Sequence, residues 1–219
     1  MAPGPPADVP GQGAALTAPL PRSFYERPAL RLARDLLGRL LVRRTPSGLL
    51  IGRIVETEAY RPDDPASHSF RGETPRNRTM FGPAGHAYVY VSHGIHHCMN
   101  VTAGNAQAVL LRALEPMEGA EEMARLRGIR DQRLLCAGPG RLSQALGITL
   151  ALDGTDLVRG PDLWIAGGAR APRAVRTPRV GLGANPAAPK PWRFVDPESR
   201  FLSRPATWGR EPARPRGSR

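Results

Sequence analysis

Hydrophobic positions follow two periods along this chain, one helical and one extended. Between residues 26 and 38, Leu30, Ala33 and Leu37 recur at helical spacing, and Gly38 follows them. An apolar stripe that stops at a glycine is typical of an amphipathic helix, because glycine readily ends a helix. The same pattern recurs at 117–128 and 140–147. These three segments are predicted to be helices.

Short apolar runs separated by turn residues predict strands elsewhere. Residues 39–44 and 49–60 flank the turn TPSG, and residues 86–92 and 95–103 flank the pair His93–Gly94, so each pair predicts a β-hairpin. Further strands are predicted at 108–116, 162–168, 179–183 and 192–196. Sequential strand pairs with interspersed helices indicate an α+β domain around a mostly antiparallel sheet.

Composition sets the limits of this domain. Residues 1–22 are mainly Pro, Gly and Ala, and residues 204–219 are rich in Pro and Arg. Such segments lack the side chains needed for a core, so we expect a disordered tail at 1–22, a single folded domain at 23–203 and a basic tail at 204–219. We find no signal peptide and no apolar run that could span a membrane. With only two cysteines, the sequence indicates a cytoplasmic protein.

The charge is strongly positive and comes almost entirely from arginine. The chain has 31 Lys and Arg residues against 19 Asp and Glu, a formal net charge of +12, and its only lysine is Lys190. Arginine makes bidentate contacts with phosphate, which favours a polyanionic partner such as nucleic acid. A genomic bias toward arginine codons would give the same composition without any such partner.

The segment YVYVSHGIHHCMN, residues 88–100, concentrates residue types that bind zinc. Neighbours on a strand point to opposite faces, so His96 and Cys98 could share a face while His97 points away. A zinc site needs three or four converging ligands, and no C-x-x-C or H-x-x-x-H pair supplies the rest. The pattern therefore disfavours a metal site, and hydrogen-bonded sheet residues are the simpler interpretation.

Two carboxylates lie near the end of the second predicted strand. In RIVETEAY, residues 53–60, alternation places Ile54, Glu56, Glu58 and Tyr60 on one face. A glutamate on a strand is usually solvated, but this strand is apolar before Glu56 and runs into a loop at 61–85 whose length is typical of functional loops. The carboxylates stand roughly 6.5–7 Å apart along the strand, which also suits an inverting glycosidase.

Several long motifs then appear in order: RIVETEAY, HS, TPRNRTMF, AYVYVSHGIHHCMN, VLLRALEP, RVGLG and WRFVD. In order and spacing they resemble the alkyladenine (3-methyladenine) DNA glycosylase family, whose members flip a damaged purine out of duplex DNA and hydrolyse its N-glycosidic bond. The resemblance covers most of the expected folded part. It implies a single α+β domain on a curved antiparallel sheet with peripheral helices, and neither a catalytic metal nor another cofactor.

The resemblance implies a catalytic pair. Glu58 resembles the general base that deprotonates the attacking water, and Arg112 resembles an arginine that lines the pocket near that water. A glycosylase that cleaves the strand through a Schiff base needs a free amine. Since Lys190 lies in the loop NPAAPKPW and the N-terminal amine heads the expected tail, we expect a monofunctional enzyme that uses water.

The resemblance also implies a base pocket and a DNA-binding surface. The pocket walls that stack on the flipped base are matched by Tyr60, His68 and Tyr90, and Asn100 matches the residue that excludes the exocyclic amine of guanine. His93 stands where many members carry a tyrosine that fills the gap left by the flipped nucleotide, and Gly94 completes that turn. His93 and Gly94 are therefore expected to bind DNA. Independently of the resemblance, the loop motif TPRNR places Arg76 and Arg78 on either side of Asn77. Such arginines usually form solvated or structural ion pairs, but the net charge favours phosphate contact, so these three residues are also expected to bind DNA.

Two other classes of function stay open at this point. One is a carbohydrate-active hydrolase that uses Glu56 and Glu58, and the other is a non-catalytic protein that binds RNA or DNA. The expectation that we carry forward is a monomeric base-excision repair enzyme that acts on double-stranded DNA containing damaged purines. Such an enzyme would associate with the nucleoid through its DNA substrate.

Overall fold

The computed structural model describes residues 18–169, 171 and 173–207. Its strands are β1 (Leu40–Thr45), β2 (Gly48–Tyr60), β3 (Ala87–Ser92), β4 (His96–Gly104), β5 (Gln107–Glu118), β6 (Leu163–Ala166), β7 (Val175–Thr177) and β8 (Arg193–Val195). Its helices are α2 (Arg22–Tyr25), α3 (Ala29–Asp35), α4 (Arg78–Phe81), α5 (Ala120–Arg127), α6 (Gln132–Leu135) and α7 (Pro139–Ala145), with a 3₁₀ turn η1 (Leu150–Leu152). The predicted α3, α5 and α7 are followed by Gly38, Gly128 and Gly147, all with positive φ.

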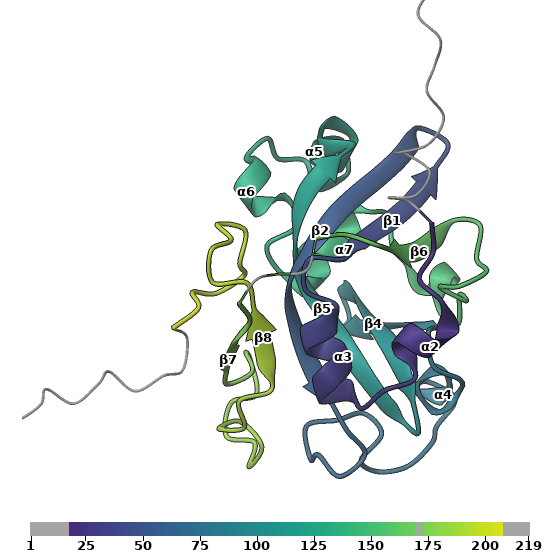
Figure 1. Cartoon of the computed structure of the whole chain (residues 1–219), viewed down its shortest axis with the longest axis vertical. Coiled ribbons are helices and arrows are strands. Elements are labelled where there is room, and N and C mark those ends of the chain that lie inside the picture. Colours follow the sequence, from purple (N-terminus) through teal and green to yellow (C-terminus); the bar gives the residue numbers. More distant parts are fainter. Residues whose placement is uncertain (1–17, 170, 172, 208–219) are drawn as a thin grey trace, which may run out of the picture.

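The described strands form one antiparallel sheet that curls around a core (Figure 1). Its order is β3-β4-β5-β2-β1-β6, with β8 joined to β2 and β7 joined to β8. The long strand β2 is central, because it pairs with β5 on one side and with β1 and then β8 on the other. The predicted single α+β domain on a curved antiparallel sheet with peripheral helices is confirmed.

A bulge in β2 determines which of its side chains face the core. The pairing of β2 with β5 shifts in register between Ile54 and Glu56 and again between Glu56 and Thr57. Ile54 therefore packs in the main core, and the Thr57 hydroxyl donates to the Ala33 carbonyl of α3. Glu56, Glu58 and Tyr60 face the opposite side of β2. The expectation that Ile54 shares a face with the two glutamates is wrong, because the extra residue of a bulge reverses the alternation.

The main core fills the concave side of the sheet beneath α3 and α7. Helix α3 packs on β2 and β5, and α7 packs on β4 and β5 (Figure 1). Leu32, Leu36, Leu111 and Leu142 are among its fully buried side chains. Burying apolar area on this scale is the main favourable contribution to folding, and it fixes the strands that carry the site.

Three sequence predictions differ from the observed elements. Residues 179–183 form an irregular loop rather than a strand, and β7 lies just before them. The loop at 61–85 contains the short helix α4. Contacts also extend past both expected domain boundaries, because Pro19 forms a β-bridge with Ala166, and Arg193 donates to the carbonyls of Arg204 and Pro205. Residues 1–17 and 208–219 of the expected tails lie outside the described residues.

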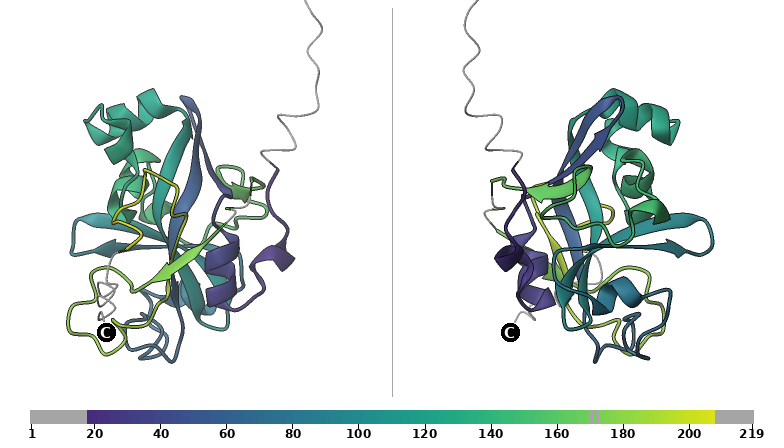
Figure 2. Two further views of the ribbon diagram at one scale, coloured as in Figure 1. Left: turned by 60° about the vertical axis from the view of Figure 1, so that its left-hand side comes forward. Right: turned by 90° about the vertical axis from the view of Figure 1, so that its right-hand side faces the viewer.

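The hairpin of β3 and β4 projects from the body of the molecule (Figure 2). Its two-residue turn consists of His93 with φ 51° and Gly94 with φ 75°, which is the left-handed pair that tight hairpins favour. Ile95, directly after the turn, is 73% exposed. In the described residues, no helix is long and apolar enough to cross a membrane.

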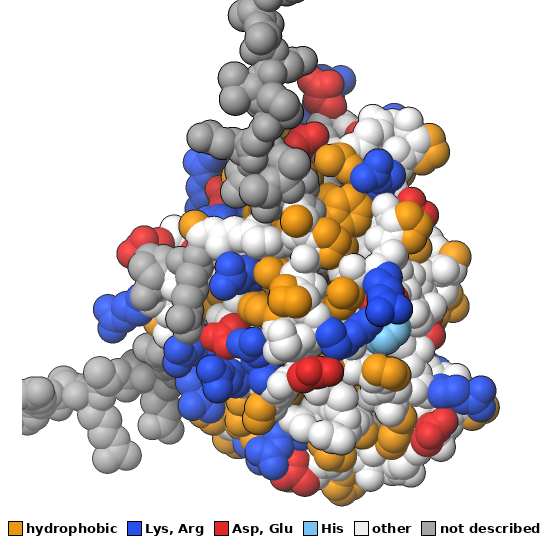
Figure 3. Space-filling view, turned by 45° about the vertical axis from the view of Figure 1, so that its right-hand side comes forward, with side chains coloured by type: hydrophobic (Ala, Val, Ile, Leu, Met, Phe, Trp, Pro, Cys, Tyr) orange, Lys and Arg blue, Asp and Glu red, His pale blue; other side chains and the backbone are white. Residues whose placement is uncertain are grey.

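Basic side chains do not form one continuous patch on the face shown in Figure 3. On the face shown in Figure 3, Lys and Arg side chains lie in several separate groups beside acidic and apolar ones. Many arginines of the described chain are paired, as Arg22 is with Asp156 at 2.6 Å and Arg27 with Asp35 at 2.7 Å. Net charge alone therefore does not locate a binding surface, and the arginines without an acidic partner are the informative ones.

Candidate active site

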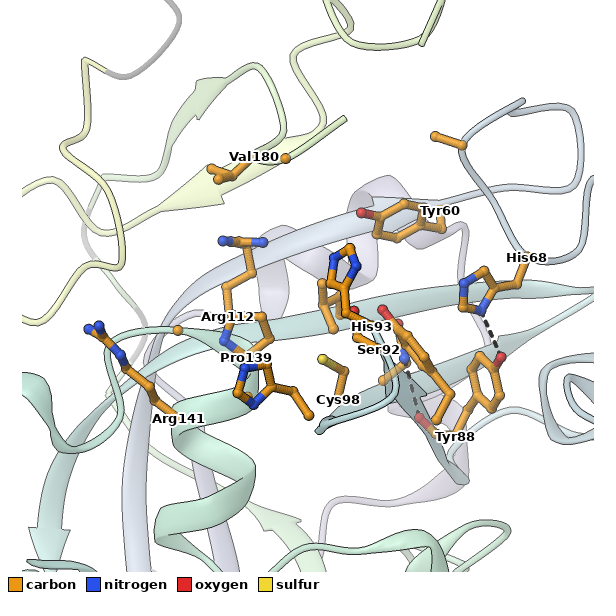
Figure 4. Close-up of a pocket in the computed structure, with 18 of the residues that line it drawn as sticks. Tyr60, His68, Tyr88, Ser92, His93, Cys98, Arg112, Pro139, Arg141 and Val180 are labelled. Atoms are coloured by element: carbon orange, nitrogen blue, oxygen red, sulfur yellow. Dashed lines mark hydrogen bonds between the residues drawn. The ribbon is translucent and has the colours of Figure 1, made fainter. Parts of the chain in front are cut away.

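One pocket of about 650 Å³ lies where β2, β3, β4 and β5 meet the loop at 61–77, the start of α7 and the loop at 180–182 (Figure 4). This volume is within the roughly 300–1,000 Å³ that is typical of ligand sites. Its side-chain walls are Tyr60, Ala66, His68, Met80, Tyr88, Tyr90, Ser92, His93, His96, Cys98, Asn100, Leu110, Arg112, Arg127, Pro139, Arg141, Val180 and Leu182. Of the predicted site residues, six line it: Tyr60, His68, Tyr90, His93, Asn100 and Arg112.

Glu58 lies directly behind this wall. Its carboxylate is fully buried, and it accepts hydrogen bonds from the Tyr60 hydroxyl at 2.9 Å and from the Val180 backbone N–H at 2.7 Å. Arg112 Nη1 lies 3.4 Å from the same oxygen that Tyr60 contacts. All three partners line the pocket, so Glu58 is separated from the pocket by the groups that hold it.

Arg112 is held between two carboxylates. Its Nε donates to Glu56 at 3.0 Å, and its Nη1 faces Glu58. Burial lowers the pKa of Arg112, but the charges of Glu58 and Glu56 raise it more, so its pKa lies above the ordinary value. The side chain is thus a fixed cation at one end of the pocket, and its part in catalysis stays a prediction.

Glu56 is a structural carboxylate. It is fully buried and accepts hydrogen bonds from Arg112, from Arg193 Nε at 2.7 Å, and from the backbone N–H and hydroxyl of Ser203 at 2.6 and 2.8 Å. Burial raises the pKa of Glu56, but the charges of Arg112 and Arg193 and these hydrogen bonds lower it more. Its acceptor positions are occupied by protein, so its role is to orient Arg112.

Aromatic rings form the other end of the pocket. The ring centroids of His68 and Tyr90 are 4.5 Å apart at 77°, and those of Tyr88 and Tyr90 are 5.7 Å apart at 28°. His68 Nδ1 and the Tyr88 hydroxyl are hydrogen-bonded at 2.8 Å, and Tyr60 lies across the space from Tyr88 (Figure 4). Burial, and then the charge of Arg76, lower the pKa of His68, which favours a neutral imidazole. Flat, largely uncharged walls of this kind suit a planar ring.

The sequence prediction missed one member of this aromatic group. Tyr88 shares a strand face with Tyr90 and bonds His68, and burial raises its pKa to about 12. The period-two spacing of the two tyrosines is the signal that could have identified it. Asn100 lies beside them on β4, is 4% exposed, and donates from Nδ2 to the Tyr88 carbonyl at 3.2 Å.

A buried ion pair supports the pocket from behind. Arg179 pairs with Asp64, and both side chains are fully buried. The Arg179 guanidinium lies 4.7 Å from the centroid of the Tyr60 ring and 5.1 Å from that of Trp192. Arg179 also precedes Val180, whose N–H holds Glu58. This pair therefore fixes both a pocket wall and a hydrogen bond to the buried carboxylate.

The predicted DNA-binding residues of the loop divide into two kinds. Asn77 is 5% exposed, and its side chain donates to the carbonyls of His68 and Gly72 and accepts from Thr74. The Asn77 side chain therefore orders the loop that carries His68, and its contact with DNA stays a prediction. Arg76 and Arg78 are exposed, with Arg76 donating to the Val91 carbonyl at 2.7 Å and Arg78 lying 3.4 Å from Glu73.

The histidine-rich segment separates in space as strand alternation requires. His96 and Cys98 face the pocket, and His96 packs against Gly140 of α7. In the described residues, no group of three or more His, Cys, Asp or Glu side chains is placed to hold a metal ion. Cys98 and Cys136 are both buried as free thiols.

Known proteins match this chain over nearly all of its described length. The family described as Methylpurine-DNA glycosylase (MPG) matches residues 23–200. Two relatives named "Putative 3-methyladenine DNA glycosylase" are those of Methanoculleus marisnigri, 51% identical over 193 residues, and Carboxydothermus hydrogenoformans, 46% identical over 188 residues. Each alignment covers 84% of this chain and 98% of the relative. A relative of the same name from Rhodopseudomonas palustris strain CGA009 is 47% identical over 207 residues, 93% of this chain and 96% of its own length.

These matches extend across β1 to β8 and so include every element that lines the pocket. Similarity of this extent goes well beyond a shared fold, which alone would say little about activity. The chain therefore belongs to the methylpurine-DNA glycosylase family, and it is a DNA repair protein of that family.

Proposed function

We propose that this chain is a monofunctional DNA glycosylase that flips alkylated or otherwise damaged purines out of duplex DNA and hydrolyses the N-glycosidic bond with a water activated by Glu58. The observation that carries the proposal is a fully buried carboxylate placed behind a pocket of aromatic rings. A flipped base would stack between Tyr60 and the His68–Tyr90 wall. The stacking and cation–π attraction of such a pocket suit an electron-poor alkylated purine.

Glu58 supplies two effects in this reaction. It takes a proton from the attacking water, and its negative charge stabilises the oxocarbenium-like sugar as the base departs. Arg112 and the Val180 N–H hold the carboxylate in one orientation. A water that reaches Glu58 has to lie among Tyr60, Arg112 and Val180, because these groups separate the carboxylate from the pocket.

The position of the only lysine of the chain supports hydrolysis rather than strand cleavage. A Schiff-base mechanism needs a lysine or an N-terminal amine at the sugar. Lys190, the only lysine of the chain, stacks on Trp192 with its Nζ 4.5 Å from the ring centroid, and it does not line the pocket. A water is therefore the nucleophile of this proposal, and an abasic site is its product.

Replacing Glu58 by Gln tests the proposal. The amide keeps the shape and most hydrogen bonds but cannot accept the proton, so single-turnover release of a neutral lesion such as hypoxanthine should fall about 10²–10⁴-fold. Binding to the same duplex should persist. Release close to that of the unaltered protein would contradict the role of Glu58. A cationic lesion is a weaker test, because its glycosidic bond needs less assistance.

No observation favours a carbohydrate-active hydrolase. That alternative needs Glu56 as a second catalytic carboxylate facing a substrate, whereas Glu56 is fully buried and occupied by Arg112, Arg193 and Ser203. A non-catalytic DNA-binding protein would tolerate Glu58→Gln without loss of function. The hypoxanthine-release assay therefore separates this alternative from the proposed enzyme.

A further inference from the structure

The pocket has two chemically different ends (Figure 4). Tyr60, His68 and Tyr88 lie at one end, and Arg112, Pro139 and Arg141 lie at the other. The basic end is formed by the start of α7, by Arg127 at the end of α5 and by His96 at the start of β4. A base-sized ring needs only the aromatic end, so the basic end calls for a separate explanation.

The charges of the basic end are compensated to different degrees. Arg112 contacts two carboxylates, those of Glu56 and Glu58. Arg127 instead donates to the Leu135 carbonyl at 3.1 Å and to the Gln144 amide oxygen at 2.5 Å.

Arg141 likewise has a neutral partner, the Ala137 carbonyl at 3.3 Å. Among the described residues, no carboxylate lies within 4.0 Å of Arg127 or Arg141. Both side chains line the same pocket, and Arg127 is held against α7 by Gln144, three residues after Arg141. Consistent with this arrangement, burial and then the charge of Arg141 lower the pKa of Arg127. Two cations on one pocket wall that have no carboxylate partner among the described residues form a site that an external anion would stabilise.

Gly138, Pro139 and Gly140, directly before Arg141, line the same pocket, and a Cβ atom on Gly140 would lie 3.0 Å from the Cβ atom of His96. Gly138 has a φ of 144°, which other residues rarely adopt. The two glycines therefore add no side chain to the pocket wall beside Arg141.

We propose that Arg127 and Arg141 bind one backbone phosphate of the damaged strand, adjacent to the flipped nucleotide. This inference rests on the proposed function, because a base held at the aromatic end is joined through its sugar to phosphates near the pocket mouth. Arginine matches phosphate oxygens with paired donors, and a phosphate contact fixes the position of a nucleotide without reading its sequence. The pair would hold the strand in place while the base occupies the pocket.

The dependence of binding on salt gives a direct test. The full-length protein is titrated with a duplex that carries a stable abasic-site analogue, over a series of salt concentrations. If the two arginines share one phosphate, the combined variant Arg127→Ala with Arg141→Ala reduces the slope of log K against log salt by about 0.9. Arg125→Ala is the matched control, since Arg125 lies on the same helix but pairs with Glu122 at 2.6 Å, and its slope stays unchanged. An unchanged slope in the double variant overturns the proposal.

Uncharged linkages in the DNA backbone identify which phosphate the two arginines bind. Each phosphate near the lesion is replaced in turn by a methylphosphonate, which removes its charge. One replacement should weaken binding by the unaltered protein and have no further effect on the double variant. If the double variant responds to every replacement as the unaltered protein does, the proposal is wrong. Thermal unfolding and the charge-retaining variant Arg127→Lys with Arg141→Lys, whose slope should equal that of the unaltered protein, separate loss of charge from loss of fold.

The failure of this inference is distinguishable from failure of the proposed function. Binding to an abasic-site analogue requires no base release, so the salt slopes are obtained whether or not the protein is a catalyst. Release of hypoxanthine by the unaltered protein tests the catalytic proposal separately. Normal release together with an unchanged slope in the double variant would refute the phosphate site alone.

Discussion

Replacing Glu56 by Gln removes one negative charge from the centre of the domain while keeping the shape of the side chain. Glu56 is fully buried and accepts hydrogen bonds from Arg193, Arg112 and both the backbone N–H and the hydroxyl of Ser203. Arg193 is also fully buried, and its remaining bonds go to the Thr177 hydroxyl and to backbone carbonyls. The variant therefore leaves a buried guanidinium without a carboxylate and turns an amide NH₂ group toward hydrogen-bond donors.

The size of the expected loss of stability follows from the burial of both Glu56 and Arg193. Breaking a buried ion pair by removing one charge costs about 3–5 kcal/mol, because the other charge stays desolvated. For a domain of this size, each kcal/mol lowers the melting temperature by roughly 2–4 °C, so we expect a decrease of about 6–20 °C. The second consequence is local, because Arg112 loses the partner that orients its Nε and should position Glu58 less well.

Chemical denaturation of the full-length variant measures this cost. Glu122→Gln is the matched control, since Glu122 also pairs with an arginine at 2.6 Å, but that arginine is exposed on the surface of α5, and the midpoint should hardly change. A loss in Glu56→Gln as small as that of the control would refute the reasoning. It would show that the Glu56–Arg193 pair is compensated by water or by rearrangement of residues 203–205.

The contribution of Glu56 to stability should decrease on acidification. The folded-state pKa of Glu56 lies below the ordinary value of 4.5, so between the two values the unfolded chain binds more protons. The stability that Glu56 contributes is therefore fully present above about pH 4.5 and is lost as the pH falls through the folded-state pKa. The difference in unfolding free energy between the unaltered protein and Glu56→Gln should shrink over that window. A difference that stays constant on acidification would contradict the depressed pKa.

Three further predictions concern the pocket. Asn100→Ser should enlarge it beside Tyr88 and raise release of methylated guanine relative to adenine lesions, and unchanged selectivity in a lesion panel would count against a steric role. His93→Tyr should increase the flipped population of an etheno-adenine duplex in stopped-flow fluorescence, and His93→Ala should decrease it, because a larger ring fills the space vacated by the flipped nucleotide better. Identical flipping equilibria for the three side chains would refute this role of His93. His68 should titrate below 6.5 by NMR, because burial and then Arg76 disfavour its charged form, and a midpoint at or above 6.5 would contradict this.

Local chemistry made several elements predictable from sequence. The hairpin at His93–Gly94 was specified by a tight-turn pair between two apolar runs, and both residues adopt positive φ. Helix α3 follows from its apolar stripe and the glycine after it. Tyr60, His68, Tyr90, Asn100 and Arg112 were assigned by resemblance and do meet in one pocket. Such features depend on residues close in the chain or on motifs that fix a position.

Long-range partners explain what the sequence could not predict. Residues 179–183 alternate like a strand, yet Arg179 pairs with Asp64 and Val180 donates its N–H to Glu58, so their backbone does not join the sheet there. The sequence likewise does not reveal that Arg127 and Arg141 lack a carboxylate partner among the described residues, because this depends on where the carboxylates lie in the fold. Asn77 looked like a surface residue between two arginines, but the loop closes around it.

The contrast between Glu56 and Glu58 shows how one strand produces two different carboxylates. The bulge after Ile54 places Glu56 and Glu58 on the face of β2 opposite Ile54, where both contact Arg112. Residues 203–205, far along the chain, close over Glu56 and its partner Arg193 with backbone bonds. Glu58 is instead covered by Tyr60 and Val180, which belong to the pocket wall. The groups that cover the two carboxylates therefore distinguish them: Glu56 is enclosed by the groups that orient it with Arg112, whereas Glu58 lies behind residues of the pocket wall, which is the position that the proposed water activation requires.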